Sequence, residues 1–133
     1  MVPNVSSDGL QVPRSVFASM VFDSFTHPAF AGARGAGAAR QVVLQAAEFD
    51  IHVRISGKPD DLVINGQILP RENREFVKSA TVHLLRDGEP FRSMSLDTFG
   101  EFEFTNTTAG MLKLQIDLPN ITVTGDLGSE EAA

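Results

Sequence analysis

Apolar and polar residues alternate along several segments of this chain, and the alternation predicts β-strands. The segment EFDIHVRIS has an apolar side chain at every second position, which is the pattern of a strand with one face on a core. The segment MLKLQIDL repeats the pattern, and it resumes after a Pro-Asn break in ITVTG. Turn residues separate these segments at intervals of roughly ten residues. We therefore predict an all-β, antiparallel sandwich whose turns are too short for crossover helices.

Two Gly-containing pairs have different predicted roles. In ATVHLLRDGEPFRSMSL, Asp87-Gly88 can supply the positive φ angles of a two-residue turn, so this segment is predicted to form a hairpin. In DLVINGQIL, the arms on either side of Asn65-Gly66 are too short for a useful hairpin. We predict one continuous strand there, in which Gly66 allows a bulge or the close approach of another backbone.

Residues 1–40 differ from the rest of the chain. An apolar cluster lies in SVFASMVFDSFTHPAF, and the following AGARGAGAAR is typical of a flexible connector. Four apolar residues of the cluster have the spacing of one helix face, namely Phe17, Met20, Val21 and Phe25. This spacing predicts a partly helical or irregular N-terminal arm. Residues 39–48 fit either strand or helix, and their Val-Val-Leu run favours a strand.

The predicted organisation is an N-terminal arm with its Gly/Ala-rich connector over residues 1–40, a β-sandwich over 41–125 and an acidic tail over 126–133. The apolar cluster has two interpretations. It covers an open edge of the sandwich, since bare edges invite aggregation, or it docks into a partner protein or a second copy of the chain. The candidate partner-binding residues are Phe17, Met20, Val21, Phe22 and Phe25.

Composition narrows the classes of partner. Among 133 residues there is no cysteine, which excludes disulfides and thiolate chemistry. The net charge of -6 repels the phosphates of nucleic acid and of anionic membrane surfaces. No apolar run reaches the roughly 20 residues of a membrane helix, and the N-terminus does not have the pattern of a secretory signal. We therefore expect a cytoplasmic protein without a nucleic-acid or membrane partner.

Four segments in succession resemble a known family. INGQI, ATVHLL, LDTFGEFEF and TAGMLKLQI are similar in order and spacing to the motifs of carboxypeptidase regulatory-like domains, over residues 62–118. The resemblance implies a seven-stranded, transthyretin-like Greek-key sandwich in which Gly100 has a positive φ and Phe102 and Phe104 lie in the core. Met111 and Leu112 stand where the family commonly has an aromatic residue. Such domains are non-catalytic modules appended to bacterial peptidases, anti-sigma factors and surface proteins.

Signals of chemistry are weak. His27, His52 and His83 lack the spacing of a metal site, and no GxSxG motif presents a nucleophilic serine. We predict no catalytic residue, metal, cofactor or small-molecule substrate. The expected function is a non-catalytic module for protein interaction or regulation in a bacterium, with a protein partner or self-association. The alternative is a carbohydrate-binding module, which the absence of Trp and Tyr disfavours because those side chains commonly stack on sugar rings.

Overall fold

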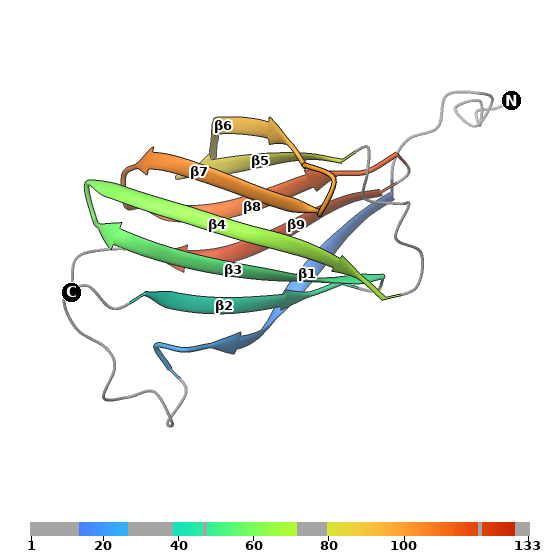
Figure 1. The fold of residues 1–133 in the computed structure, drawn as a ribbon, viewed down its shortest axis with the longest axis horizontal. Helices are drawn as coiled ribbons and strands as arrows, with labels where there is room; N and C mark the ends of the chain where they lie inside the picture. Colours follow the sequence, from blue (N-terminus) through green and yellow to red (C-terminus); the bar gives the residue numbers. More distant parts are fainter. Residues whose placement is uncertain (1–13, 27–38, 47, 72–79, 120, 130–133) are drawn as a thin grey trace, which may run out of the picture.

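Nine β-strands account for the regular structure of the described residues, and none of these residues forms a helix (Figure 1). The computed structural model describes residues 14–26, 39–46, 48–71, 80–119 and 121–129. The strands are β1 (Arg14–Asp23), β2 (Arg40–Gln45), β3 (Phe49–Lys58), β4 (Asp61–Pro70), β5 (Thr81–Arg86), β6 (Glu89–Ser95), β7 (Glu101–Thr107), β8 (Met111–Asp117) and β9 (Ile121–Ser129). Within this part of the chain no helix is long and apolar enough to cross a membrane.

All nine strands belong to one mixed sheet, in the order β6-β5-β8-β9-β1-β2-β3-β4-β7. The sheet curls until its end strands β6 and β7 lie near each other, which makes it nearly barrel-shaped (Figure 1). One layer contains β2, β3, β4 and β7, and the other contains β5, β6, β8 and β9. Strand β1 joins them, because Arg14–Ala18 pair with β9 and Ser19–Asp23 pair with β2.

The all-β prediction is confirmed, but the sheet differs from a seven-stranded antiparallel sandwich. It contains nine strands, and β1 runs parallel to β9. One additional strand and the parallel pairing arise at the N-terminal end, because the prediction placed residues 1–40 in an arm outside the sheet. Strand β1 instead lies between β9 and β2 and makes ladder pairs with both.

The predicted helix in the apolar cluster is wrong, since residues 14–23 form β1 and residues 24–26 form a turn. Val16, Phe17 and Val21 are of the β-branched and aromatic types that favour strands. The first half of β1 pairs with β9 and the second half with β2, so ladder hydrogen bonds to neighbouring strands take the place of intrahelical ones. Pairing with β2 and β9 therefore makes this segment a strand, although the spacing of its apolar residues fits one face of a helix.

The strands at the two ends of the predicted sandwich have defined bounds in the structure. The ambiguous segment 39–48 contains strand β2, as its Val-Val-Leu run indicated, with Val42 and Leu44 fully buried. Strand β9 continues to Ser129, beyond the predicted limit at residue 125, because Leu127 is also fully buried in the core. The connector at 27–38 and the last residues, 130–133, lie outside the described residues.

The two phenylalanines of β7 lie in the core, as predicted. Phe102 and Phe104 are each 3% exposed, and their ring centroids are 5.9 Å apart. Gly100, at the turn before β7, has a φ of 77°, which also agrees with the sequence. Burying each aromatic side chain stabilises the fold by roughly 1.5–3 kcal/mol. The two rings therefore anchor β7, although it is an end strand of the sheet.

The hairpin predicted around Asp87-Gly88 is confirmed. Strands β5 and β6 pair up to Arg86 and Glu89, and only Asp87 and Gly88 lie between them. Their φ angles are 53° and 85°, the positive values of the two-residue turn that matches the twist of the strands. Asp87 also accepts a hydrogen bond from the amide of Met111, which ties the hairpin to β8.

Strand β4 runs without interruption through Asn65-Gly66, as predicted. Gly66 pairs with Phe102 of β7, and the Phe102 ring lies directly over the glycine. A Cβ atom at Gly66 would be 2.1 Å from the Cζ of Phe102, which no real contact permits. The close neighbour is thus a side chain rather than the backbone that the sequence suggested, and it explains why this strand position carries a glycine.

Candidate functional site

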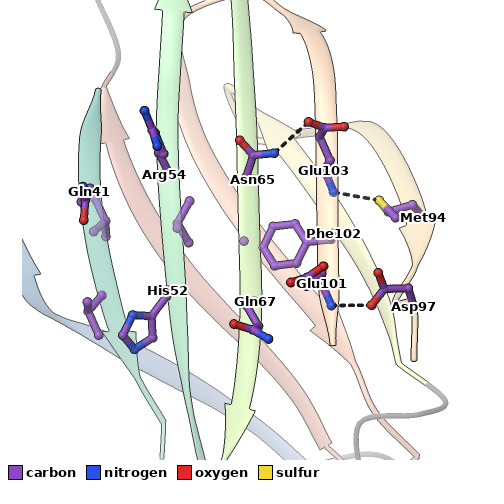
Figure 2. A pocket seen from close by; sticks show the side chains of 14 residues that line it. Gln41, His52, Arg54, Asn65, Gln67, Met94, Asp97, Glu101, Phe102 and Glu103 are labelled. Carbon is purple, nitrogen blue, oxygen red and sulfur yellow. Dashed lines mark hydrogen bonds between the residues drawn. The ribbon is translucent and has the colours of Figure 1, made fainter. Parts of the chain in front are cut away.

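A groove of about 670 Å³ crosses the outer face of the layer that contains β2, β3, β4 and β7 (Figure 2). Its polar lining comes from alternate positions of four neighbouring strands, and two further residues come from β6 and the loop after it. The polar lining residues are Gln41, His52, Arg54, Asn65, Gln67, Asp97, Glu101 and Glu103. The side chain of Met94 lies at the β7 end of the groove (Figure 2).

Strand register arranges this lining in two rows that cross the sheet. Paired residues on adjacent antiparallel strands have their side chains on one face, so each row is a set of direct neighbours. The first row is Gln41, Arg54, Asn65 and Glu103. The second row is Val43, His52, Gln67 and Glu101. The same alternation that buries Val53 and Phe102 therefore places polar side chains side by side on the outside.

Hydrogen bonds hold the β7 end of the groove in place. Asn65 Nδ2 donates to Glu103 Oε2 at 2.8 Å, and Gln67 Nε2 donates to the carbonyl of Phe99 at 3.2 Å. Asp97 Oδ1 accepts from the amides of Phe99 and Glu101, each at 2.9 Å, which shapes the turn before β7. These contacts fix the turn and the side chains that approach it before any ligand arrives.

Charge is unevenly distributed along the groove. Three exposed carboxylates, those of Asp97, Glu101 and Glu103, lie together at the β7 end. Arg54 lies two strands away on β3, and it has no salt-bridge partner among the residues that the structure describes. The β7 end is therefore suited to a cationic group, whereas the middle of the groove presents amides, an imidazole and one guanidinium.

The opposite end of the second row is apolar. Val43 pairs with Phe22 of β1, so the row runs on from Glu101 to an aromatic side chain at the junction of the two layers. Phe22 is half-buried and makes a further interaction in addition to its pairing with Val43. One residue of the predicted partner-binding cluster therefore lies in line with the groove, a relation that no local sequence signal could have revealed.

The other residues of that cluster are distributed around β1. Phe17 is 82% exposed, Val21 is 53% exposed and Met20 is 38% exposed, whereas Phe25 in the following turn is half-buried. Phe17 pairs with Thr124 of β9 and so belongs to the other layer. The structure thus does not bring the five residues into one helical stripe, and a binding role for them stays a prediction.

The histidines occupy separate places. His52 is exposed in the groove on β3, and His83 lies on β5 in the other layer, so the two do not meet. His27 lies outside the described residues. Within the described ranges, no group of three or more His, Asp or Glu side chains could hold a metal ion.

A second polar cluster, on the other layer, was missed by sequence reasoning. His83 Nδ1 is 2.6 Å from Ser93 Oγ, and His83 Nε2 is 2.9 Å from Asp117 Oδ2. Asp117 Oδ1 accepts further hydrogen bonds from Gln115 and Thr122. This order of serine, imidazole and carboxylate arises because β5 pairs with both β6 and β8. It lies away from the groove and links four strands, so we assign it a stabilising role.

The Asp117 carboxyl gives a testable dependence of stability on pH. Burial acts to raise its pKa, but hydrogen bonds from Gln115 and His83 outweigh burial, and the pKa lies below its ordinary value of 3.8. A carboxyl with a lowered folded-state pKa stabilises the fold above its unfolded pKa, and this stabilisation is lost as pH falls through the folded value. We expect Asp117→Asn to be less stable than wild type at neutral pH and the difference to shrink below pH 3.8.

Urea unfolding at a series of pH values measures this effect. The matched control is Asp60→Asn, which changes an exposed carboxyl in the turn between β3 and β4. The control variant should follow wild type at neutral pH. A deficit of Asp117→Asn that stays constant from neutral pH to well below pH 3.8 would contradict the assignment.

Comparison of the chain with protein-family models, with curated proteins and with solved structures gave no match.

Proposed function

We propose that this chain is a non-catalytic module that binds a partner protein, or a second copy of itself, across the groove. The observation that carries the proposal is a row of paired residues whose side chains change from apolar at one end to acidic at the other. The row runs from Phe22 and Val43, through His52 and Gln67, to Glu101. Its apolar end can bury an aliphatic or aromatic side chain of a partner, and its acidic end can pair with a lysine or arginine. Protein interfaces combine these two features, with an apolar anchor and charged residues toward the rim.

The acidic end supplies selectivity more than affinity. An exposed ion pair contributes only about 0.2–1 kcal/mol, so two carboxylates together account for roughly a twofold to thirtyfold change in affinity. A partner that presents carboxylates to this end of the groove is repelled by the carboxylates already there. Asp97, Glu101 and Glu103 therefore favour a basic segment of a partner. The net charge of -6 acts in the same direction at longer range.

Membership of the carboxypeptidase regulatory-like family, and with it a transthyretin-like Greek-key arrangement, is part of this proposal. It is supported by the positions of the strands, since β4, β5, β7 and β8 each contain the alternating part of one of the four segments that resemble the family motifs. A regulatory or accessory role in the bacterial cytoplasm is the corresponding expectation. Such domains act by binding rather than by catalysis, which agrees with a groove lined by amides and carboxylates.

The test is selection from a displayed library of random peptides on immobilised full-length protein. We expect enriched peptides to contain lysine or arginine together with a large apolar residue. Their affinity for Glu101→Gln/Glu103→Gln should fall roughly twofold to thirtyfold, because glutamine keeps the shape and the acceptor of each side chain but removes its charge. Amide chemical-shift changes on peptide binding should map to β3, β4 and β7.

A control variant separates charge at the groove from charge in general. Asp60→Asn/Asp61→Asn removes one carboxylate from the β3–β4 turn and one from the first residue of β4, and it should leave peptide affinity unchanged. Thermal unfolding of each variant checks that it folds. Enriched peptides that bind the groove variant and wild type equally well, or a failure to enrich any peptide, would overturn the proposal.

A carbohydrate ligand is a second candidate, because Phe99 is 73% exposed and lies beside the groove. An exposed ring next to amide side chains can stack on a sugar while the amides bind its hydroxyls. Retardation on polysaccharide gels that is lost in Phe99→Ala, with no peptide enriched, would favour this candidate.

A further inference from the structure

The nine-stranded sheet has one seam, where its end strands β6 and β7 lie near each other without a ladder (Figure 1). Two contacts that use side chains bridge it. The amide of Glu103 donates to Met94 Sδ at 3.2 Å, and Arg92 Nη2 donates to the carbonyl of Asn106 at 3.1 Å. An end strand is normally a template for another chain, and here side chains occupy that place.

These contacts show which way the β7 backbone faces. The amide of Glu103 points to β6 and away from β4, because its acceptor lies on β6. The amide of Glu101 likewise leaves the sheet to reach Asp97 Oδ1. A thioether is a weak acceptor, so the Glu103 amide would make a stronger hydrogen bond to a peptide carbonyl.

We propose that the partner's contacting segment is an extended basic peptide that adds to the edge of β7 as a strand, in the seam beside β6. The inference rests on the proposed function, because it requires that the ligand of the acidic end is a protein. Strand addition to an open edge is a common mode of peptide recognition, in which main-chain hydrogen bonds give affinity and alternate side chains give specificity.

The side chains of β7 define the sequence of this peptide. Glu101 and Glu103 face outward, and Phe102 and Phe104 face the core. A strand beside β7 would therefore place alternate side chains next to the carboxylates and next to the rings. A peptide of alternating basic and apolar residues fits both faces, with lysine or arginine outside and valine, leucine or isoleucine inside.

For a strand to be added, Arg92 must leave the carbonyl of Asn106, Asp97 must leave the amide and the carbonyl of Glu101, and Met94 must also move. Met94 is half-buried on β6 and packs against the core, so its side chain fills the seam. Methionine is unbranched and adapts to new positions, which suits a side chain that is displaced by a ligand. Once it leaves, the amide of Glu103 becomes available to a carbonyl of the peptide.

The experiment uses a blocked peptide of alternating lysine and valine, with a glutamate-valine peptide as charge control, and full-length protein. Two further versions carry N-methyl groups on all lysines or on all valines. Only one of these two sets of amides faces β7 in an added strand. We expect the version methylated on the amides that face β7 to lose at least tenfold in affinity, and the version methylated on the amides that face β6 to lose less. The Glu103 amide should also become protected from hydrogen exchange.

Met94→Leu provides a second measurement, because it removes the sulfur acceptor and keeps an apolar side chain of similar volume in the seam. We expect the parent peptide to bind Met94→Leu at least as tightly as wild type. Equal binding of both methylated versions, or no protection at Glu103, would overturn strand addition and leave the groove proposal standing. No binding of the lysine-valine peptide, while library peptides bind the groove, would also overturn it. If neither the lysine-valine peptide nor any library peptide binds the protein, both proposals are overturned.

Discussion

Replacing Arg40 with alanine is expected to destabilise the protein by about 3–5 kcal/mol, the cost of leaving one buried charge of an ion pair without its partner. Arg40 and Asp23 have side chains that are 9% and 12% exposed. Two hydrogen bonds join them, from Nη2 to Oδ2 at 2.7 Å and from Nε to Oδ1 at 3.0 Å. Arg40 Nη1 also donates to the carbonyl of Leu127 at 2.8 Å. One side chain thereby connects β1, β2 and β9, and urea unfolding measures its loss.

A surface ion pair serves as the matched control. Arg14 and Glu48 are 3.3 Å apart, but their side chains are 60% and 43% exposed. Arg14→Ala should therefore cost no more than about 1 kcal/mol. The double variant Arg40→Met/Asp23→Asn should cost less than the two single changes together, because it leaves no unpaired charge. Similar costs for Arg40→Ala and Arg14→Ala would contradict the role assigned to the buried pair.

Substitution of Gly66 by alanine is expected to cost about 1–3 kcal/mol or more, since an added methyl group has to displace a packed ring. The new Cβ would lie 2.1 Å from Cζ and 2.5 Å from Cε2 of Phe102. Phe102 is 3% exposed, so the ring is packed against other residues and has to shift to make room. Urea unfolding of Gly66→Ala against wild type gives the change in free energy of unfolding.

A double-mutant cycle tests whether the ring is the cause. Phe102→Leu removes the atoms nearest to Gly66 and creates space at the cost of core packing. In that background the alanine at position 66 should be tolerated much better than in wild type. Equal costs in the two backgrounds would mean that backbone conformation, rather than the Phe102 ring, requires the glycine.

Local patterns were sufficient for much of the fold. The alternation in β3, β8 and β9 and the Asp87-Gly88 turn are signals that neighbouring residues carry by themselves, and the structure agrees with each of them. Strand β1 is the counterexample. The spacing of Phe17, Met20 and Val21 fits one face of a helix, and only the pairing with β2 and β9 decides against it.

The groove could not be predicted because it depends on which strands are neighbours. His52 and Glu101 join one row only after β3 pairs with β4 and β4 pairs with β7, and the segment that becomes β5 and β6 separates β4 from β7 in sequence. The contact between His83 and Asp117 has the same origin, since it requires the pairing of β5 with β8. Alternation shows that these side chains face outward, whereas register shows which of them meet.

The pairing of β1 with both β2 and β9 has a consequence for the order of folding. Antiparallel partners β2, β3 and β4 follow one another and can form as the chain leaves the ribosome. The first half of β1 must wait for β9, which is synthesised after all eight other strands. Contacts between residues so distant in sequence form slowly. The strand that is made first is therefore among the last to be completed, and the first half of β1 lacks its partner strand until β9 emerges.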